Sequence, residues 1–232
     1  MIKRVEVQYR GIFQKTLGKY IGSDIVQIAS RMGKVAFSNG RYSDAPERNG
    51  IPCKYFAFVS PDLSEEELEA ECGSSLDIAD VDVSVVVDDT MAKGVEPWGW
   101  HGIRPVNEKV GHKSCLLMVT RHDHEHLLKF TAKQPFPYRL ATLEGDASLA
   151  GLWVFKDDLT RERCLGAVAA VDPGVISIEA VEEYLLDTTQ DADRARAARD
   201  AYDMTLRRIK VVNPDQGIDW PHEIPVLPKW HE

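Results

Sequence analysis

The residues with the clearest chemical potential stand in the turn after the first predicted strand. Alternation of apolar and polar residues predicts a strand over 5–9, and the turn that follows reads RGIFQKTLG over 10–18. In open α/β folds this turn meets phosphates, because the next helix begins there with unpaired N–H groups. The turn matches neither the dinucleotide glycine pattern nor the P-loop, so nucleotide hydrolysis has no support. Arg10, Gln14 and Lys15 could still bind an anion, and a purely structural turn is the alternative.

Three histidines, His122, His124 and His126, form the obvious metal candidate. Residues at i, i+2 and i+4 share one face only on an extended strand. The preceding strand is expected to end at Thr120, and either Thr120 or Asp123 suits the N-cap of a helix. We therefore favour a solvated first helical turn over a metal site.

Other chemistry-bearing patterns are few. An aromatic cluster, WGWHG at 98–102, lies in a long Gly/Pro/Trp segment over 90–111. Long segments of this kind are often functional, so a ligand lid, a subunit contact and packing on the sheet all remain open. No G-x-S-x-G or H-E-x-x-H pattern occurs, and no pair of carboxylates has a catalytic setting. We expect no catalytic residue and no metal ligand in this chain.

The four cysteines argue against an electron carrier. They lie 19 or more positions apart, without a C-x-x-C pair, whereas zinc sites and iron–sulfur clusters normally need close pairs. We expect reduced thiols that pack as small hydrophobic side chains. The four are Cys53, Cys72, Cys115 and Cys164.

The elements that must position these residues follow from hydrophobic periodicity. Apolar residues recur at spacings of three and four over 17–35, which predicts a helix, and Gly18 and Gly22 on one face suggest close approach to another backbone. Ser64 and Glu67 form a capping-box pattern. Further strands are predicted at 55–60, 81–88, 115–120 and 138–143, and helices at 64–70, from 121 to about 133, at 160–171, 177–186 and 191–210.

Strands separated by helices predict an α/β fold. We expect a three-layer, Rossmann-like, mainly parallel sheet with helices on both faces, followed by a C-terminal helix and an extended tail. The predicted domains are 1–188, the α/β domain, and 189–232, the helix with a tail that docks on a partner. The tail after Asn213 holds four prolines and two tryptophans, too few residues for a core of its own.

Length and composition fit a globular protein. The 232 residues are 44% hydrophobic and carry 28 Lys and Arg against 37 Asp and Glu, a net charge of −9. No window approaches 18 uninterrupted apolar residues, and the start MIKRVEVQYR is charged where a signal peptide would be apolar. We expect a cytoplasmic protein.

The charge is unevenly distributed along the chain. Residues 1–60 sum to +6, whereas residues 62–92 hold eleven acids and no Lys or Arg. The basic first quarter could attract an anionic ligand, or it could form the rim of a subunit interface.

Four segments together resemble the gamma subunit, or gamma domain, of the 2-oxoacid:acceptor oxidoreductases, a family that includes pyruvate and phenylglyoxylate oxidoreductases. VEVQYRG with Gln14 falls where the family has a strand and a glycine-rich turn. PERNGIP over 46–52 resembles the family's P-E-R-R-G-A-P run, which is the most specific part. ADVD through DDT over 79–90 resembles its central strand and turn. LGA over 165–167 with VISIE over 175–179 resembles its late helix–turn–helix.

The resemblance implies a role in a larger enzyme. Such enzymes oxidatively decarboxylate a 2-oxo acid and transfer the acyl group to coenzyme A. Thiamine diphosphate and iron–sulfur clusters are held by other subunits, so no cofactor is assigned to this chain alone. The implied partners are thiamine-binding alpha and beta subunits and an iron–sulfur subunit, with a flavin/NAD electron-acceptor subunit as an optional addition. Neither nucleic acid nor membrane is implied.

Within this resemblance, Arg48 and Glu47 are the best candidates for coenzyme A contacts, with Arg10, Gln14 and Lys15 beside them. An interface salt bridge is the alternative for the Arg48–Glu47 pair. The first turn departs from the family pattern because it lacks several glycines, which suggests a specialised branch with an aromatic substrate such as phenylglyoxylate. The second function hypothesis is a Rossmann-like scaffold subunit that binds no small molecule.

Overall fold

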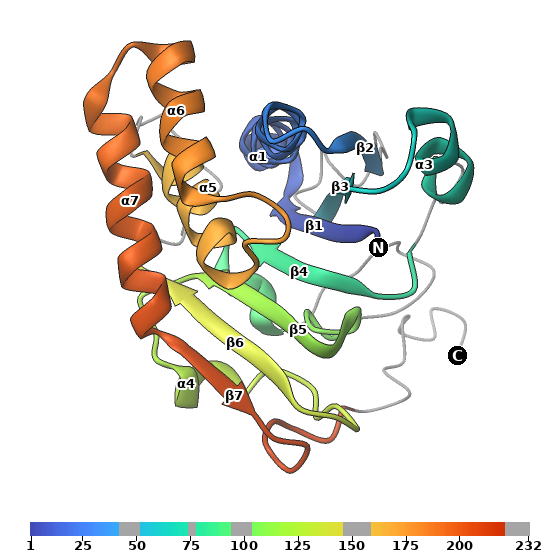
Figure 1. Ribbon diagram of the computed structural model, residues 1–232. Helices are drawn as coiled ribbons and strands as arrows, with labels where there is room; N and C mark the ends of the chain where they lie inside the picture. Colours follow the sequence, from blue (N-terminus) through green and yellow to red (C-terminus); the bar gives the residue numbers. More distant parts are fainter. Residues whose placement is uncertain (42–51, 74–77, 94–103, 146–158, 221–232) are drawn as a thin grey trace.

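The computed structural model describes residues 1–41, 52–73, 78–93, 104–145 and 159–220 (Figure 1). One seven-stranded sheet has the order β2-β3-β1-β4-β5-β6-β7. The strands are β1 Lys3–Arg10, β2 Val35–Arg41, β3 Pro52–Ser60, β4 Val81–Val86, β5 Val110–Val119, β6 Tyr138–Leu143 and β7 Ile209–Val212. The helices are α1 Gly11–Arg31, α3 Glu65–Cys72, the 3₁₀ turn η1 Asp89–Lys93, α4 His124–Leu128, α5 Thr160–Val171, α6 Ile178–Thr189 and α7 Ala192–Arg207.

The sheet is parallel at its centre and antiparallel at its ends. β1, β4, β5 and β6 run in one direction, whereas β3 opposes both β1 and β2, and β7 opposes β6. The predicted α/β class with a mainly parallel sheet is confirmed. The antiparallel additions β2 and β7 were not predicted.

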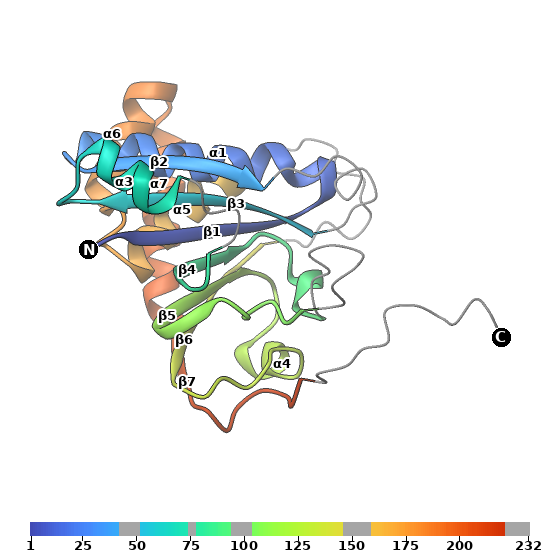
Figure 2. The ribbon, with the colours of Figure 1, turned by 90° about the vertical axis from the view of Figure 1, so that its right-hand side faces the viewer.

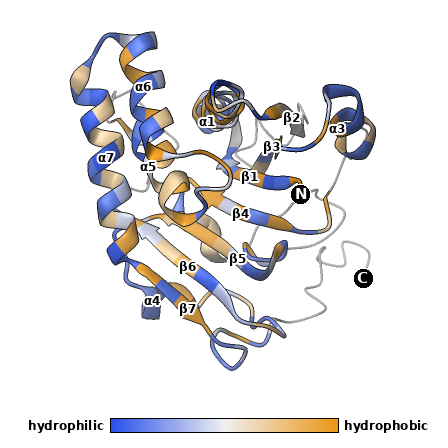
Figure 3. Cartoon of the chain, viewed as in Figure 1, coloured by the Kyte–Doolittle hydropathy of each residue, from blue (hydrophilic) through white to orange (hydrophobic). Residues whose placement is uncertain are grey.

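Helices cover both faces of the sheet, as predicted (Figures 1 and 2). α1, α5, α6 and α7 bury the larger apolar cluster against one face. On the other face, α4 covers the strands from β4 to β7 and α3 covers β2 and β3. Hydrophobic residues concentrate in the strands and in α5, whereas α3 and α7 show long hydrophilic stretches (Figure 3). Among the described helices, none has the combination of length and apolar character that a bilayer crossing requires.

Helix α1 ends earlier than its apolar stripe predicted. Gly33 adopts a φ of 74°, a left-handed conformation that ends the helix and lets Val35 begin β2. The predicted close approach at Gly18 and Gly22 is real, but its partners are aromatic rings rather than a backbone. A Cβ on Gly18 would lie 2.5 Å from the ring of Tyr9, and one on Gly22 would overlap the ring of Tyr55. The two glycines therefore leave room for two aromatic rings of the sheet to pack against α1.

Local sequence signals correctly predicted where two other helices begin. Ser64 and Glu67 form both bonds of the capping box of α3, and Ser177 caps α6 as predicted. The helix predicted for 191–210 stops at Arg207, because residues 209–212 pair with β6. α7 packs along α5, so the described part of residues 189–220 shares the core of the sheet. The predicted tail beyond residue 220 lies outside the described residues.

Candidate functional site at the carboxyl ends of the parallel strands

The polar residues of the first turn lie where the central parallel strands end. Since β1, β4 and β5 run in parallel, Arg10, the last residue of β1, lies at the same edge of the sheet as Asp88 and Thr120, which follow β4 and β5. Helix α1 starts at the same edge, directly after Arg10 (Figure 2). Ligands of open α/β sheets bind at this kind of edge.

Asp88 is the centre of the site. Its carboxylate is fully buried and accepts hydrogen bonds from Gln14 Nε2 at 2.9 Å and from the Thr90 backbone N–H and hydroxyl at 2.9 and 2.6 Å. Arg10 Nε lies 3.8 Å away. A buried carboxylate is costly without such partners. The Asp88 network therefore joins the end of β4 to the first turn of α1.

Both the oxygen and the nitrogen of the Gln14 side-chain amide form hydrogen bonds that hold this turn. Its Oε1 accepts a 2.6 Å hydrogen bond from the Arg10 backbone N–H, and its Nε2 donates to Asp88. Gln14 is only 3% exposed, whereas Lys15 is half-buried. Arg10, Gln14 and Lys15 were predicted to lie together, and the structure adds Asp88, which accepts a hydrogen bond from Gln14 and lies 3.8 Å from Arg10.

The start of α1 has the electrostatics of an anion site. Its first turn contains no acidic residue, and the side chain of Arg10, at the N-cap, does not cap the helix. Arg10 Nε is buried and has no hydrogen-bond partner among the described residues, while the side chain as a whole is about a third exposed. The positive end of a 21-residue helix and one guanidinium N–H without a described hydrogen-bond partner therefore lie at the same edge.

A second polar group lies at the end of β5. The Thr120 hydroxyl donates to Asp89 Oδ2 at 2.5 Å and accepts from the His122 backbone N–H at 2.9 Å. His122 Nε2 lies 4.0 Å from the same Asp89 oxygen, and its ring stacks on His126 at a centroid distance of 3.9 Å. This pair of a half-exposed imidazole and a largely buried carboxylate was not predicted, because Asp89 and His122 follow different strands.

The histidine cluster divides between two environments. Asp123, one of the two residues expected to suit the N-cap, caps α4, and its bond from the His126 N–H lowers the pKa of Asp123. The expectation of a solvated turn is wrong for His124, which is buried with Nε2 2.8 Å from the Arg208 carbonyl and 3.2 Å from that of Leu140. Through these two contacts the His124 ring links the end of α7 to β6. In the described part of the chain, no three or more potential ligands gather into a metal site.

A buried polar network behind the site was missed by sequence reasoning. Glu6 and Gln8 alternate with apolar residues in the predicted strand over 5–9, and both are buried. Glu6 accepts from Lys54 Nζ at 3.0 Å, from the Ser84 hydroxyl at 2.7 Å and from Gln8 Nε2 at 2.9 Å. The buried Gln8 Oε1 has no partner among the described residues. The alternation of apolar and polar residues cannot by itself show that both faces of a strand are buried.

The remaining candidates have no described position. Arg48, Glu47 and the aromatic cluster at 98–102 lie outside the described residues. The strand that follows Arg48 in sequence, β3, begins at Pro52, and Pro52 pairs with Arg10.

The solved structures that share this architecture include two subunits of oxidoreductases. The pyruvate oxidoreductase subunit PORC of Thermotoga maritima matches with a TM-score of 0.58 and 18% identity, over 90% of this chain and 98% of that one. The gamma subunit of a keto/oxoacid ferredoxin oxidoreductase of Geobacter sulfurreducens matches with a TM-score of 0.58 and 17% identity, over 90% and 99%. No family model and no curated protein matches the sequence. At these identities the comparison establishes a shared fold: this chain has the α/β fold of these two oxidoreductase subunits.

Proposed function

We propose that this chain is the gamma-type subunit of a 2-oxoacid oxidoreductase complex. The observation that carries the proposal is the extent of the match, which spans nearly all of two subunits of such enzymes. The four segments that resemble the gamma family support it independently. In this proposal the chain completes a reaction centre whose catalytic residues lie in other subunits.

Coenzyme A is the proposed ligand at the carboxyl edge of the sheet. Its phosphates suit the positive start of α1 and the partly exposed guanidinium of Arg10. Lys15 stands in the same first turn, and Gln14 with Asp88 holds that turn in shape. The P-E-R-x-G-x-P motif with Glu47 and Arg48 ends at Pro52, the partner of Arg10 in the sheet. The residues present therefore fit a phosphate-bearing ligand.

Thiamine diphosphate and the iron–sulfur clusters belong to the partner subunits in this proposal, where they supply decarboxylation and electron transfer. The four cysteines lie on β3, α3, β5 and α5, and all four are buried thiols rather than disulfides. Burial raises the pKa of Cys115 to about 12, so this thiol stays protonated at neutral pH. These thiols act as packing side chains, as the sequence predicted.

The finer parts of the proposal concern partners and substrate. The partners are thiamine-binding alpha and beta subunits and an iron–sulfur subunit, in a cytoplasmic assembly, and the segment beyond residue 220 docks on one of them. The substrate is an aromatic 2-oxo acid such as phenylglyoxylate. The sequence of the first turn supports this choice of substrate, because Ile12 and Phe13 stand there in place of small residues.

A scaffold subunit without a small ligand is the second candidate. The observation that favours it is the closed network of Gln14 and Asp88, whose hydrogen bonds are made within the chain. A scaffold would leave the coenzyme A dependence of the complex unchanged when the carboxyl edge is altered.

The complex purified with its partners tests these alternatives through the rate at varied coenzyme A concentration. We expect Arg48→Ala and Arg10→Gln each to raise the KM for coenzyme A about tenfold, because each removes a charge-assisted hydrogen bond, while kcat stays within about twofold. Arg196→Gln is the matched control, since Arg196 is a largely exposed arginine on α7 that pairs with Asp193. A KM for coenzyme A that stays unchanged in both Arg48→Ala and Arg10→Gln would favour the scaffold.

A further inference from the structure

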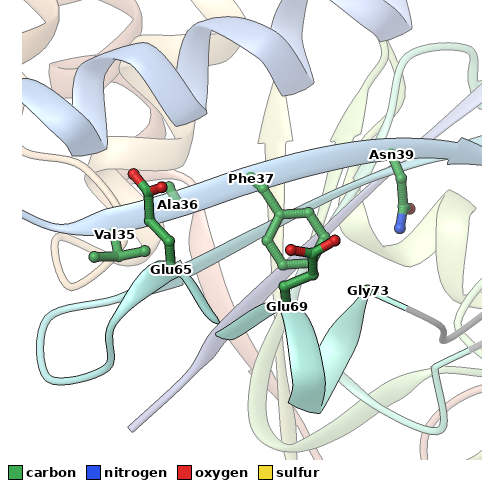
Figure 4. Close-up of a pocket in the computed structure, with 7 residues that line it drawn as sticks. All are labelled: Val35, Ala36, Phe37, Asn39, Glu65, Glu69 and Gly73. Atoms are coloured by element: carbon green, nitrogen blue, oxygen red, sulfur yellow. The ribbon is translucent and has the colours of Figure 1, made fainter. Parts of the chain in front are cut away.

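A groove lies between α3 and the edge strand β2, away from the carboxyl-edge site. Its cavity volume is about 460 Å³, and it is lined by residues of β2, residues of α3 and the glycine that follows α3 (Figure 4). The lining residues are Val35, Ala36, Phe37, Asn39, Glu65, Glu69 and Gly73. Carboxylates on one wall would repel phosphates, so this groove suits a different ligand from the other edge.

The β2 wall offers an apolar surface and a strand edge. Phe37 stacks on Phe58 at 5.0 Å and packs, half-buried, against the apolar cluster beneath α3. β2 is the terminal strand of the sheet and pairs only with β3 among the described strands. An edge of this kind presents backbone N–H and C=O groups to an added strand.

The α3 wall is strongly acidic. The helix reads EEELEAEC, with five glutamates and no basic residue. Glu67 serves the capping box, whereas Glu65 and Glu69, one helical turn apart, line the groove. Both are exposed, and neither forms an ion pair with a described residue.

The distance between the two glutamates on α3 matches the two-residue repeat of β2. Figure 4 shows Glu65 beside Val35 and Ala36, and Glu69 beside Phe37, so α3 follows the direction of β2. Four residues of helix advance about 6 Å and two residues of strand about 6.6 Å. In an extended segment paired with β2, two side chains two positions apart would therefore lie opposite Glu65 and Glu69.

We propose that this groove binds an extended basic segment of a partner protein, which pairs with β2 and places lysine or arginine at alternate positions opposite Glu65 and Glu69. The aliphatic stems of these side chains would cover Phe37 while their charged ends reach the carboxylates. A second copy of this chain suits the groove less well. Pairing β2 with β2 would bring two acidic helices together, and β2 contains a single basic residue, Arg41.

The test uses the full chain and a labelled seven-residue peptide in which lysine alternates with valine. Fluorescence anisotropy measures its affinity at about 50 mM salt. We expect Glu65→Gln/Glu69→Gln to weaken binding about 5- to 10-fold, the sum of two partly exposed ion pairs. Glu66→Gln/Glu71→Gln removes the same charge from exposed positions that do not line the groove, and should change affinity less than about twofold. Hydrogen exchange should slow in the β2 amides when the peptide binds.

Five results would overturn the proposal. Equal weakening by both double variants would reduce the interaction to general charge attraction, as would equal binding of a shuffled peptide with consecutive lysines. Absence of peptide binding or of β2 protection would exclude strand addition. Self-association of the chain that strengthens in Glu65→Gln/Glu69→Gln, measured by ultracentrifugation, would make the groove an interface between two copies.

Discussion

Replacing Gly166 by alanine is expected to destabilise the chain by about 3 kcal/mol or more. Gly166 lies in α5 against Ala198 of α7, where an added Cβ would lie 2.7 Å from the Ala198 carbonyl carbon, 3.0 Å from its Cα and closer still to its oxygen. These are backbone atoms, which cannot rotate away as a side chain can. The better helix propensity of alanine, about 1 kcal/mol, offsets only part of this cost.

Urea unfolding followed by circular dichroism measures this loss. Gly111→Ala is the control, because the nearest atom to its added Cβ is the Ser114 hydroxyl oxygen at 3.4 Å, and it should stay within about 1 kcal/mol of the parent. Similar stability of the two variants would mean that α5 and α7 are not in close contact at Gly166.

Breaking the buried Glu6–Lys54 pair should have a comparably large effect. Lys54→Met leaves the fully buried Glu6 carboxylate without its cation, which costs about 3–5 kcal/mol. Replacing both, in Glu6→Leu/Lys54→Met, should cost clearly less than the sum of the two single changes, because no unpaired charge remains.

A double-mutant cycle from urea unfolding gives the coupling between the two residues. Arg196→Met removes an exposed ion pair with Asp193 and should cost less than about 1 kcal/mol. A Lys54→Met variant as stable as Arg196→Met would show that water reaches the pair.

The sequence predicted the elements that depend on local signals. The capping box at Ser64, the N-cap at Ser177 and the strand at 138–143 all appear as expected, because each depends on residues within a few positions. β2 was hidden because its first residue, Val35, continues the apolar stripe of α1. β7 was hidden by the helix-forming residues before it, and only its pairing with β6 makes it a strand.

The candidate site was predicted in part for a similar reason. Arg10, Gln14 and Lys15 are neighbours in sequence, so their shared position at the carboxyl edge could be predicted. The Gln14–Asp88 bond joins residues 74 positions apart, and the Glu6–Lys54 pair depends on the register of β1 with β3. Such contacts follow from strand order, which local patterns do not encode.

Membership in a thiamine- and iron-dependent assembly is the central claim, and capture of the tagged full chain from its own cells tests it most directly. Thiamine diphosphate, iron and acid-labile sulfide would be measured in whatever is captured with the chain. The account predicts partner subunits together with all three in constant proportion. Capture of partners that contain neither thiamine diphosphate nor iron, or turnover of a 2-oxo acid by the isolated chain, would contradict it.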